Sequence, residues 1–233
     1  MIAKIKTNPV LAIMLAMIIL SIIFVSCKNK SDSTASGKKE SIIAENKQDK
    51  ETKLDVSKDE LEKMNIFLSA FTQVYLTNFD VNTITPEQLI AFGIRHNYLN
   101  VVNCFQHPSE DSEHGNILLE DKYVTESVKK YFDIDFKAHG TVSEENGRGF
   151  HYDGKYYIFW AADGAGYPMA RIKEVFENRS GQLGMTGEIY CYIFDDEDYV
   201  EKSEATFEAY AKPHKYAGED TWSIISFKSK IIE

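Results

Sequence analysis

The sequence has few cysteines and lacks the motifs that mark common metal and catalytic sites. Its three cysteines, Cys27, Cys104 and Cys191, include no closely spaced pair of the kind that holds zinc. Its six histidines include no His-x-x-x-His pair, and neither a Gly-x-Ser-x-Gly elbow nor a Walker-type phosphate loop is present. We therefore expect no cofactor, and we expect a non-enzyme rather than an enzyme because no nucleophile can be named.

Basic residues are also scarce in the part of the chain that should fold. Residues 57–233 contain 17 Lys and Arg against 30 Asp and Glu, a formal charge of −13. Such a surface is repelled by nucleic-acid phosphates and by anionic lipid headgroups. The charge argues against a nucleic-acid partner and stays compatible with a basic partner or a cation.

Residues 28–56 have no aromatic side chain at all. They contain seven Lys, six Asp or Glu and many Ser, Thr, Asn and Gln. A segment of this composition cannot bury enough apolar surface to offset the entropy lost on ordering. Together with Cys27, residues 27–56 are therefore predicted to be a disordered tether.

An apolar segment precedes this tether. Lys4 and Lys6 come before a run from Val10 to Val25 that is broken only by Ser21. A basic start followed by a short apolar run is typical of an export signal. The alternative is an uncleaved membrane helix, for which the run is slightly short of the ~20 residues needed to span a bilayer.

The end of that segment, Phe24-Val25-Ser26-Cys27, resembles the lipobox of bacterial lipoproteins, with Phe24 in place of the usual Leu. The resemblance implies that residues 1–26 are a signal peptide and that a diacylglycerol is attached to Cys27 by a thioether. It also implies that the new amino terminus can receive a fatty acid such as palmitate. The mature protein would then be lipid-anchored on the extracytoplasmic side of the cell membrane or in the outer membrane.

Residues 57–233 are predicted to form a single α+β domain, with helices first and strands second. Ser57 to Glu60 reads as a capping box, and apolar residues then recur at helical spacing from Leu61 to Tyr75. Thr85-Pro86-Glu87-Gln88 is a second helix start. A short helix is predicted from Thr125 to Asp133, after a polar loop at 103–116.

From His139 onward the pattern favours strands. Asp153-Gly154 lies between two aromatic runs and predicts a tight hairpin. Met169 to Phe176 and Gly187 to Phe194 predict a second hairpin, and 205–211 and 221–232 add further strands. We expect these strands to form one antiparallel, meander-like sheet on which the N-terminal helices pack.

Cys104 and Cys191 leave two alternatives in an exported chain. They can form a disulfide that closes a long loop, or they can be buried reduced thiols that act as small hydrophobic residues. We favour the second, because Cys191 lies in the middle of a predicted strand.

The candidate binding residues are aromatic. Tyr157, Trp160 and Tyr167 belong to a larger group of Tyr and Trp that could form a platform for stacking sugars or peptides. The alternative, which we favour and apply to Trp160 in particular, is that these rings fill the core between helices and sheet.

Three local clusters are also considered as sites. His107 and His114 flank acidic residues that could hold a transition metal, although loop clusters are poor evidence for coordination. Residues 195–198 are all acidic and are expected to be a solvated strand end, and the glycine-containing segment 163–168 is expected to be a connection.

The sequence thus favours a lipid-anchored binding or interaction module of the bacterial envelope, with a protein, peptide or glycan as its ligand. One alternative is an envelope hydrolase with a site built on the sheet and the 103–116 loop. Another is an acidic inhibitor or immunity-like protein that captures a cationic enzyme or toxin. A deep pocket with convergent polar residues would favour the hydrolase, and a flat acidic or aromatic surface would favour the other two.

Overall fold

The protein is described by a computed structural model that covers residues 52–232, except 102, 109–111, 144–148, 162–165, 179 and 196–197, with only the backbone of residue 195. The elements, in chain order, are β1 (Thr52–Lys53), α2 (Lys58–Thr72), β2 (Asn78–Asp80), α3 (Pro86–Asn100), β3 (Phe105–Gln106), β4 (Ile117–Glu120), α4 (Asp121–Phe132), β5 (His151–Tyr152), β6 (Tyr156–Phe159), β7 (Met169–Glu177), β8 (Leu183–Asp195), β9 (Asp198–Tyr216) and β10 (Glu219–Ile231). The predicted α+β class, with helices packed on a C-terminal antiparallel meander, is confirmed.

Both helix starts read from the sequence are present. Ser57 caps α2 by accepting the N–H of Glu60, which is one of the two bonds of the predicted box. At α3, Thr85 and Gln88 form both bonds of a capping box, with Pro86 in the first turn. The third helix begins at Asp121, four residues before the predicted Thr125. This start was missed because its N-cap residue makes no side-chain capping bond that the sequence could reveal.

The large sheet has the order β1-β7-β8-β9-β10-β2, with antiparallel pairing throughout. Helix α2 lies against β7, where two polar side chains of the helix complete the strand's hydrogen bonding. Ser69 accepts the N–H of Ala170 (3.1 Å), and Asn65 accepts the N–H of Ile172 (2.8 Å). These bonds hold the helix close to the edge of the β7–β10 meander.

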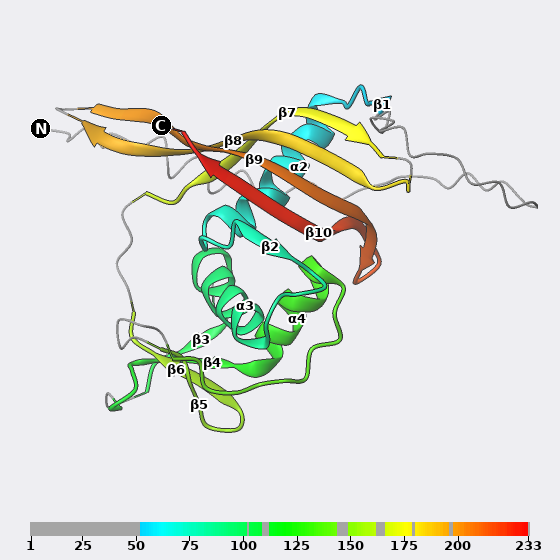
Figure 1. The fold of residues 1–233 in the computed structure, drawn as a ribbon. Coiled ribbons are helices and arrows are strands. Elements are labelled where there is room, and N and C mark those ends of the chain that lie inside the picture. The colour runs from blue at the N-terminus through cyan, green and yellow to red at the C-terminus, as the bar shows by residue number, and fades with distance from the viewer. Residues whose placement is uncertain are drawn as a thin grey trace, which may run out of the picture. The chain divides into compact units, whose positions relative to one another are not determined.

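The prediction of a single sheet is wrong, because the Asp153-Gly154 hairpin belongs to a second one. Strands β3, β4, β6 and β5 form this small sheet, in which Tyr156 to Phe159 pair with Ile117 to Glu120. Figure 1 shows α3 and α4 between the large sheet above and the small sheet below. The segment 103–116, which was predicted to be a loop, contains the short strand β3 of this sheet.

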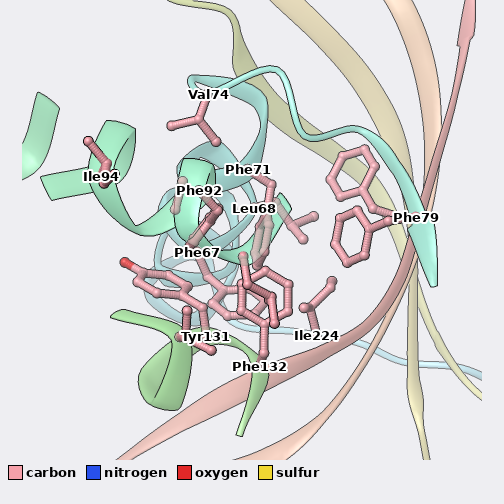
Figure 2. Close-up of a cluster of buried hydrophobic side chains, with 14 of the residues drawn as sticks. Phe67, Leu68, Phe71, Val74, Phe79, Phe92, Ile94, Tyr131, Phe132 and Ile224 are labelled. Carbon is pink, nitrogen blue, oxygen red and sulfur yellow. The ribbon is translucent and has the colours of Figure 1, made fainter. Parts of the chain in front are cut away.

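The main core lies between the helices and the large sheet, and Phe71 is at its centre (Figure 2). Phe71 is fully buried, and its ring contacts those of Phe67, Phe79, Phe92, Tyr131, Phe132 and Phe227 at centroid distances from 5.2 to 6.4 Å. These rings come from α2, α3 and α4 and from both strands of the β2–β10 pair, so one aromatic cluster joins the helices to the large sheet.

The end of the predicted tether is part of the fold. Lys53 pairs with Phe176 and its ammonium contacts Glu174 at 2.8 Å, while the N–H of Leu54 donates to Val175 at 2.9 Å. Leu54 and Val56 pack against the core. The prediction that residues 27–56 form a disordered tether is therefore wrong for residues 52–56. Their short alternation of polar and apolar side chains is too brief to predict a strand, and the pairing with β7 provides the order. Residues 27–51 lie outside the described part of the chain.

Cys104 and Cys191 are both buried free thiols, as favoured from the sequence. Burial raises the pKa of Cys104 to about 11, which keeps this thiol protonated.

Candidate functional cleft

A cleft of about 890 Å³ lies between the helices and the small sheet. It is bordered by the C-terminal end of α2, by one face of α3, and by the loops that flank β5 and β6. Clefts of this size are typical of small-ligand and peptide sites. Its aromatic lining consists of Tyr75, Tyr98, Phe150, Phe159, Trp160 and Tyr167.

The floor of the cleft is apolar and rigidly packed. Phe150 and Phe159 are 8% and 5% exposed, and their rings meet edge to face at 5.7 Å. The ring of Tyr98 on α3 contacts Phe159 at 6.0 Å. The small sheet is therefore fixed to α3 by aromatic contacts directly under the cleft.

The rim carries two exposed aromatic side chains. Trp160 directly follows β6 and is 48% exposed, so the prediction that it is a core residue is wrong. The strand alternation explains this result, because Tyr157 and Phe159 point inward and leave the next position outward. Tyr167, which is half-buried, lines the same cleft. The structure thus brings together two of the three predicted stacking residues.

Tyr157, the third predicted stacking residue, lies elsewhere. It is fully buried, and its hydroxyl is 2.9 Å from Nδ1 of His139, whose Nε2 is 3.0 Å from the hydroxyl of Thr125. Burial raises the pKa of Tyr157 and lowers the pKa of His139. The ring of Tyr157 is not accessible to a ligand, and its hydroxyl instead helps to fix the small sheet to α4.

Tyr75 is held in a conformation that its residue type disfavours. It follows α2 with a φ of 59°, in the left-handed region where glycine is usual at a helix end. Its side chain is 70% exposed at the rim of the cleft. A non-glycine residue in this conformation costs on the order of 1 kcal/mol, and such outliers concentrate at functional sites. The side chain of Tyr75 is therefore a candidate contact for a ligand.

A pair of stacked histidines also lines the cleft. The rings of His114 and His151 are 3.7 Å apart and nearly parallel, and Nε2 of His114 is 3.2 Å from Oε1 of Glu113. A tight turn positions His114: Ser112 and Gly115 bond to each other, and Gly115, with a φ of 152°, lies against the backbone of β6. A Cβ at Gly115 would be 2.1 Å from the carbonyl carbon of Phe159.

Arg95 places a positive charge at the cleft. Its guanidinium lies 5.7 Å from the ring centroid of Phe150. The remaining polar lining residues are Gln73, Thr141 and Ser143. The cleft therefore combines flat apolar rings with hydrogen-bond donors and acceptors. Sugars and peptides bind to sites with this combination.

Sequence reasoning did not single out Arg95 or Tyr75. A signal for Arg95 exists, because it is the only Lys, Arg, Asp or Glu of α3 beyond Glu87. No signal exists for Tyr75, since its left-handed conformation is not readable from its residue type.

Other candidates from the sequence do not join the cleft or are not described. His107 is exposed and does not line it, although His114 does. Cys27, Asp163 and the neighbouring glycine, and the acidic residues between β8 and β9 lie outside the described side chains. Within the residues that the structure describes, no group of three or more His, Cys, Asp or Glu is placed to hold a metal.

The remaining findings concern membrane-spanning helices and similarity to known proteins. Among the described helices, none is both long enough and apolar enough to cross a membrane. No family model, curated protein or solved structure matches the chain.

Proposed function

We propose that this chain is a lipid-anchored binding protein of the bacterial envelope, and that its ligand, a glycan or peptide, occupies the cleft beside Trp160. The lipobox-like ending at Cys27 supports the anchor. The ~890 Å³ cleft supports ligand binding.

The observation that carries the ligand proposal is the exposure of Trp160. An indole ring that is 48% exposed at the edge of a cleft leaves apolar area in water that a ligand can cover. Sugars and peptide side chains stack on such rings, while neighbouring polar groups fix their orientation. Tyr75, which follows α2 and also lines the cleft, provides a second exposed ring.

The ligand proposal is tested by calorimetric titration of the full chain in detergent with a soluble peptidoglycan digest, which contains both glycan and peptide. Trp160→Ala should weaken binding by roughly tenfold or more, as expected for loss of a stacking ring. Ile66→Ala is the matched control, because Ile66 is also 48% exposed but lies on α2 outside the cleft. No binding by the wild type, or equal loss in both variants, would contradict the proposal.

The anchor is tested by Cys27→Ser. The thioether and the cleavage that follows it both need this sulfur, so the variant should be either uncleaved or released from membranes. Cys104→Ser is the control, because Cys104 is a buried thiol of the folded part. Unchanged mature mass and unchanged membrane fractionation of Cys27→Ser would show that the chain is not a lipoprotein.

A further inference from the structure

The end of the β8–β9 hairpin extends beyond the rest of the large sheet (Figure 1). Strand β7 pairs with β8 only as far as Tyr190, and β10 pairs with β9 only as far as Ala205. We call the two strand segments beyond these points, residues 191–195 and 198–203, the arm. An isolated two-stranded ribbon is marginally stable in water, so a surface that covers it would stabilise it.

The arm holds an unusual share of the exposed apolar surface. Among the described residues, eleven large hydrophobic side chains are exposed, and five of them are in the arm. These five, with exposed fractions from 39% to 70%, are Tyr192, Ile193, Phe194, Tyr199 and Val200. The strand register places Tyr192, Phe194 and Tyr199 on one face of the arm and Ile193 and Val200 on the other. Exposed apolar groups of this kind mark interaction surfaces.

The base of the arm shows which chemistry its surface can bind. The guanidinium of Arg171 lies 4.1 Å from the ring centroid of Tyr190 and forms a two-point ion pair with Glu201, with distances of 2.6 and 2.8 Å. An arginine of this chain is thus held between an aromatic ring and a carboxylate. Further along the ribbon, Phe194 and Tyr199 form an exposed aromatic pair, with ring centroids 5.3 Å apart.

The charge of the arm selects among possible occupants. From 191 to 203 the sequence has acidic residues at 195–198 and at 201, and one basic residue, Lys202. Glu201 is paired with Arg171, so the excess negative charge belongs to residues 195–198. A second copy of this acidic chain and an anionic lipid surface are both repelled by such a ribbon. A basic polypeptide is attracted to it.

We propose that the arm is a docking surface for a basic polypeptide, bound as an extended segment whose Arg side chains lie over Phe194 and Tyr199. Among the described residues, the edge of β9 at 198–203 pairs with no strand on its outer side, so the segment can also bond to the backbone there. This proposal is independent of the cleft.

The test uses a labelled short peptide that alternates Arg and Val, with capped ends, and measures its anisotropy with the full chain in detergent. The wild type should bind it, and added salt should weaken binding. Phe194→Ser combined with Tyr199→Ser should weaken binding roughly tenfold, and Ile66→Ser, on α2, should not. Asp198→Lys, which leaves both rings in place, should also weaken it. A version of the peptide with Glu in place of Arg should not bind.

Three results would overturn the proposal. The first is absent binding, or equal binding by the wild type and the doubly substituted arm. The second is concentration-dependent dimerisation that the double substitution abolishes, which would make a second copy the occupant. The third is quenching of Tyr199→Trp fluorescence by brominated lipids after reconstitution into phosphatidylethanolamine–phosphatidylglycerol vesicles, which would make the membrane the occupant.

Discussion

Lowering the pH from about 7 to about 5 should destabilise the protein through one buried histidine, His96. Its side chain is 7% exposed in the aromatic core, where its ring is parallel to that of Phe92 and meets Tyr131 edge to face at 4.7 Å. Burial, with a smaller contribution from the charge of Lys130, lowers the pKa of His96 from 6.5 to about 3. The folded protein therefore keeps this ring neutral over the whole interval.

The direction of the change in stability with pH follows from proton linkage. Below the unfolded pKa of 6.5 the unfolded chain binds a proton at His96 that the folded protein does not, so stability falls as the pH falls toward 3. One bound proton changes the free energy of unfolding by about 1.4 kcal/mol per pH unit, so the loss between pH 6.5 and 5 is about 2 kcal/mol. Burial also lowers the pKa of His139, so that residue adds a loss of the same sign in the wild type and in variants at position 96.

The assay is urea unfolding at about pH 7 and about pH 5. His96→Phe retains a ring that can pack between Phe92 and Tyr131 but cannot titrate, so its loss of stability should be about 2 kcal/mol smaller than that of the wild type. His107→Phe, in an exposed loop, should retain the wild-type loss. Equal pH dependence of the wild type and His96→Phe would refute the reasoning, whatever the absolute stability of the variant.

Three further predictions concern stability and use the same denaturant assay. Phe71→Ala should cost about 3–5 kcal/mol because it removes the central buried ring, whereas Trp160→Ala should cost less than about 1 kcal/mol; similar costs would invert our assignment of core and rim. Tyr75→Gly should raise stability by up to about 1 kcal/mol, since glycine adopts a φ of 59° without strain, and a loss would show that the tyrosine ring packs favourably. A chain that begins at Ser57 should be about 1–2 kcal/mol less stable than one that begins at Thr52, because only the longer chain retains the contacts of Leu54 with β7. Equal unfolding midpoints for the two chains would show that residues 52–56 belong to the tether after all.

The features that the sequence predicted are those set by local chemistry. The capping box at Thr85 and the Asp153-Gly154 turn depend on neighbouring residues, and both are present. Asp153 accepts the N–H groups of Tyr156 (2.7 Å) and Lys155 (2.9 Å), and the first of these bonds is the main reason that its pKa is lowered.

The features that were missed depend on contacts between distant segments. Tyr156 to Phe159 carry no local sign that their partner is β4 rather than β7, so the second sheet was not predicted. The wrong prediction for Trp160 has the same cause. Because Trp160 lies at the end of the small sheet, its ring lines the cleft and does not enter the main core. The cleft itself joins the ends of α2 and β6, which are more than eighty residues apart, and periodicity gives no information on such a pairing.

The central claim, that the cleft binds an envelope ligand, is tested most directly by the indole N–H resonances of the two tryptophans. Trp160 lies on the rim of the cleft, while Trp222 lies 5.8 Å from Phe67 on the other side of the helices. Addition of the peptidoglycan digest to the isotope-labelled full chain should shift the Trp160 signal and leave that of Trp222 in place. No shift at saturating digest, or a shift of Trp222 alone, would contradict the account.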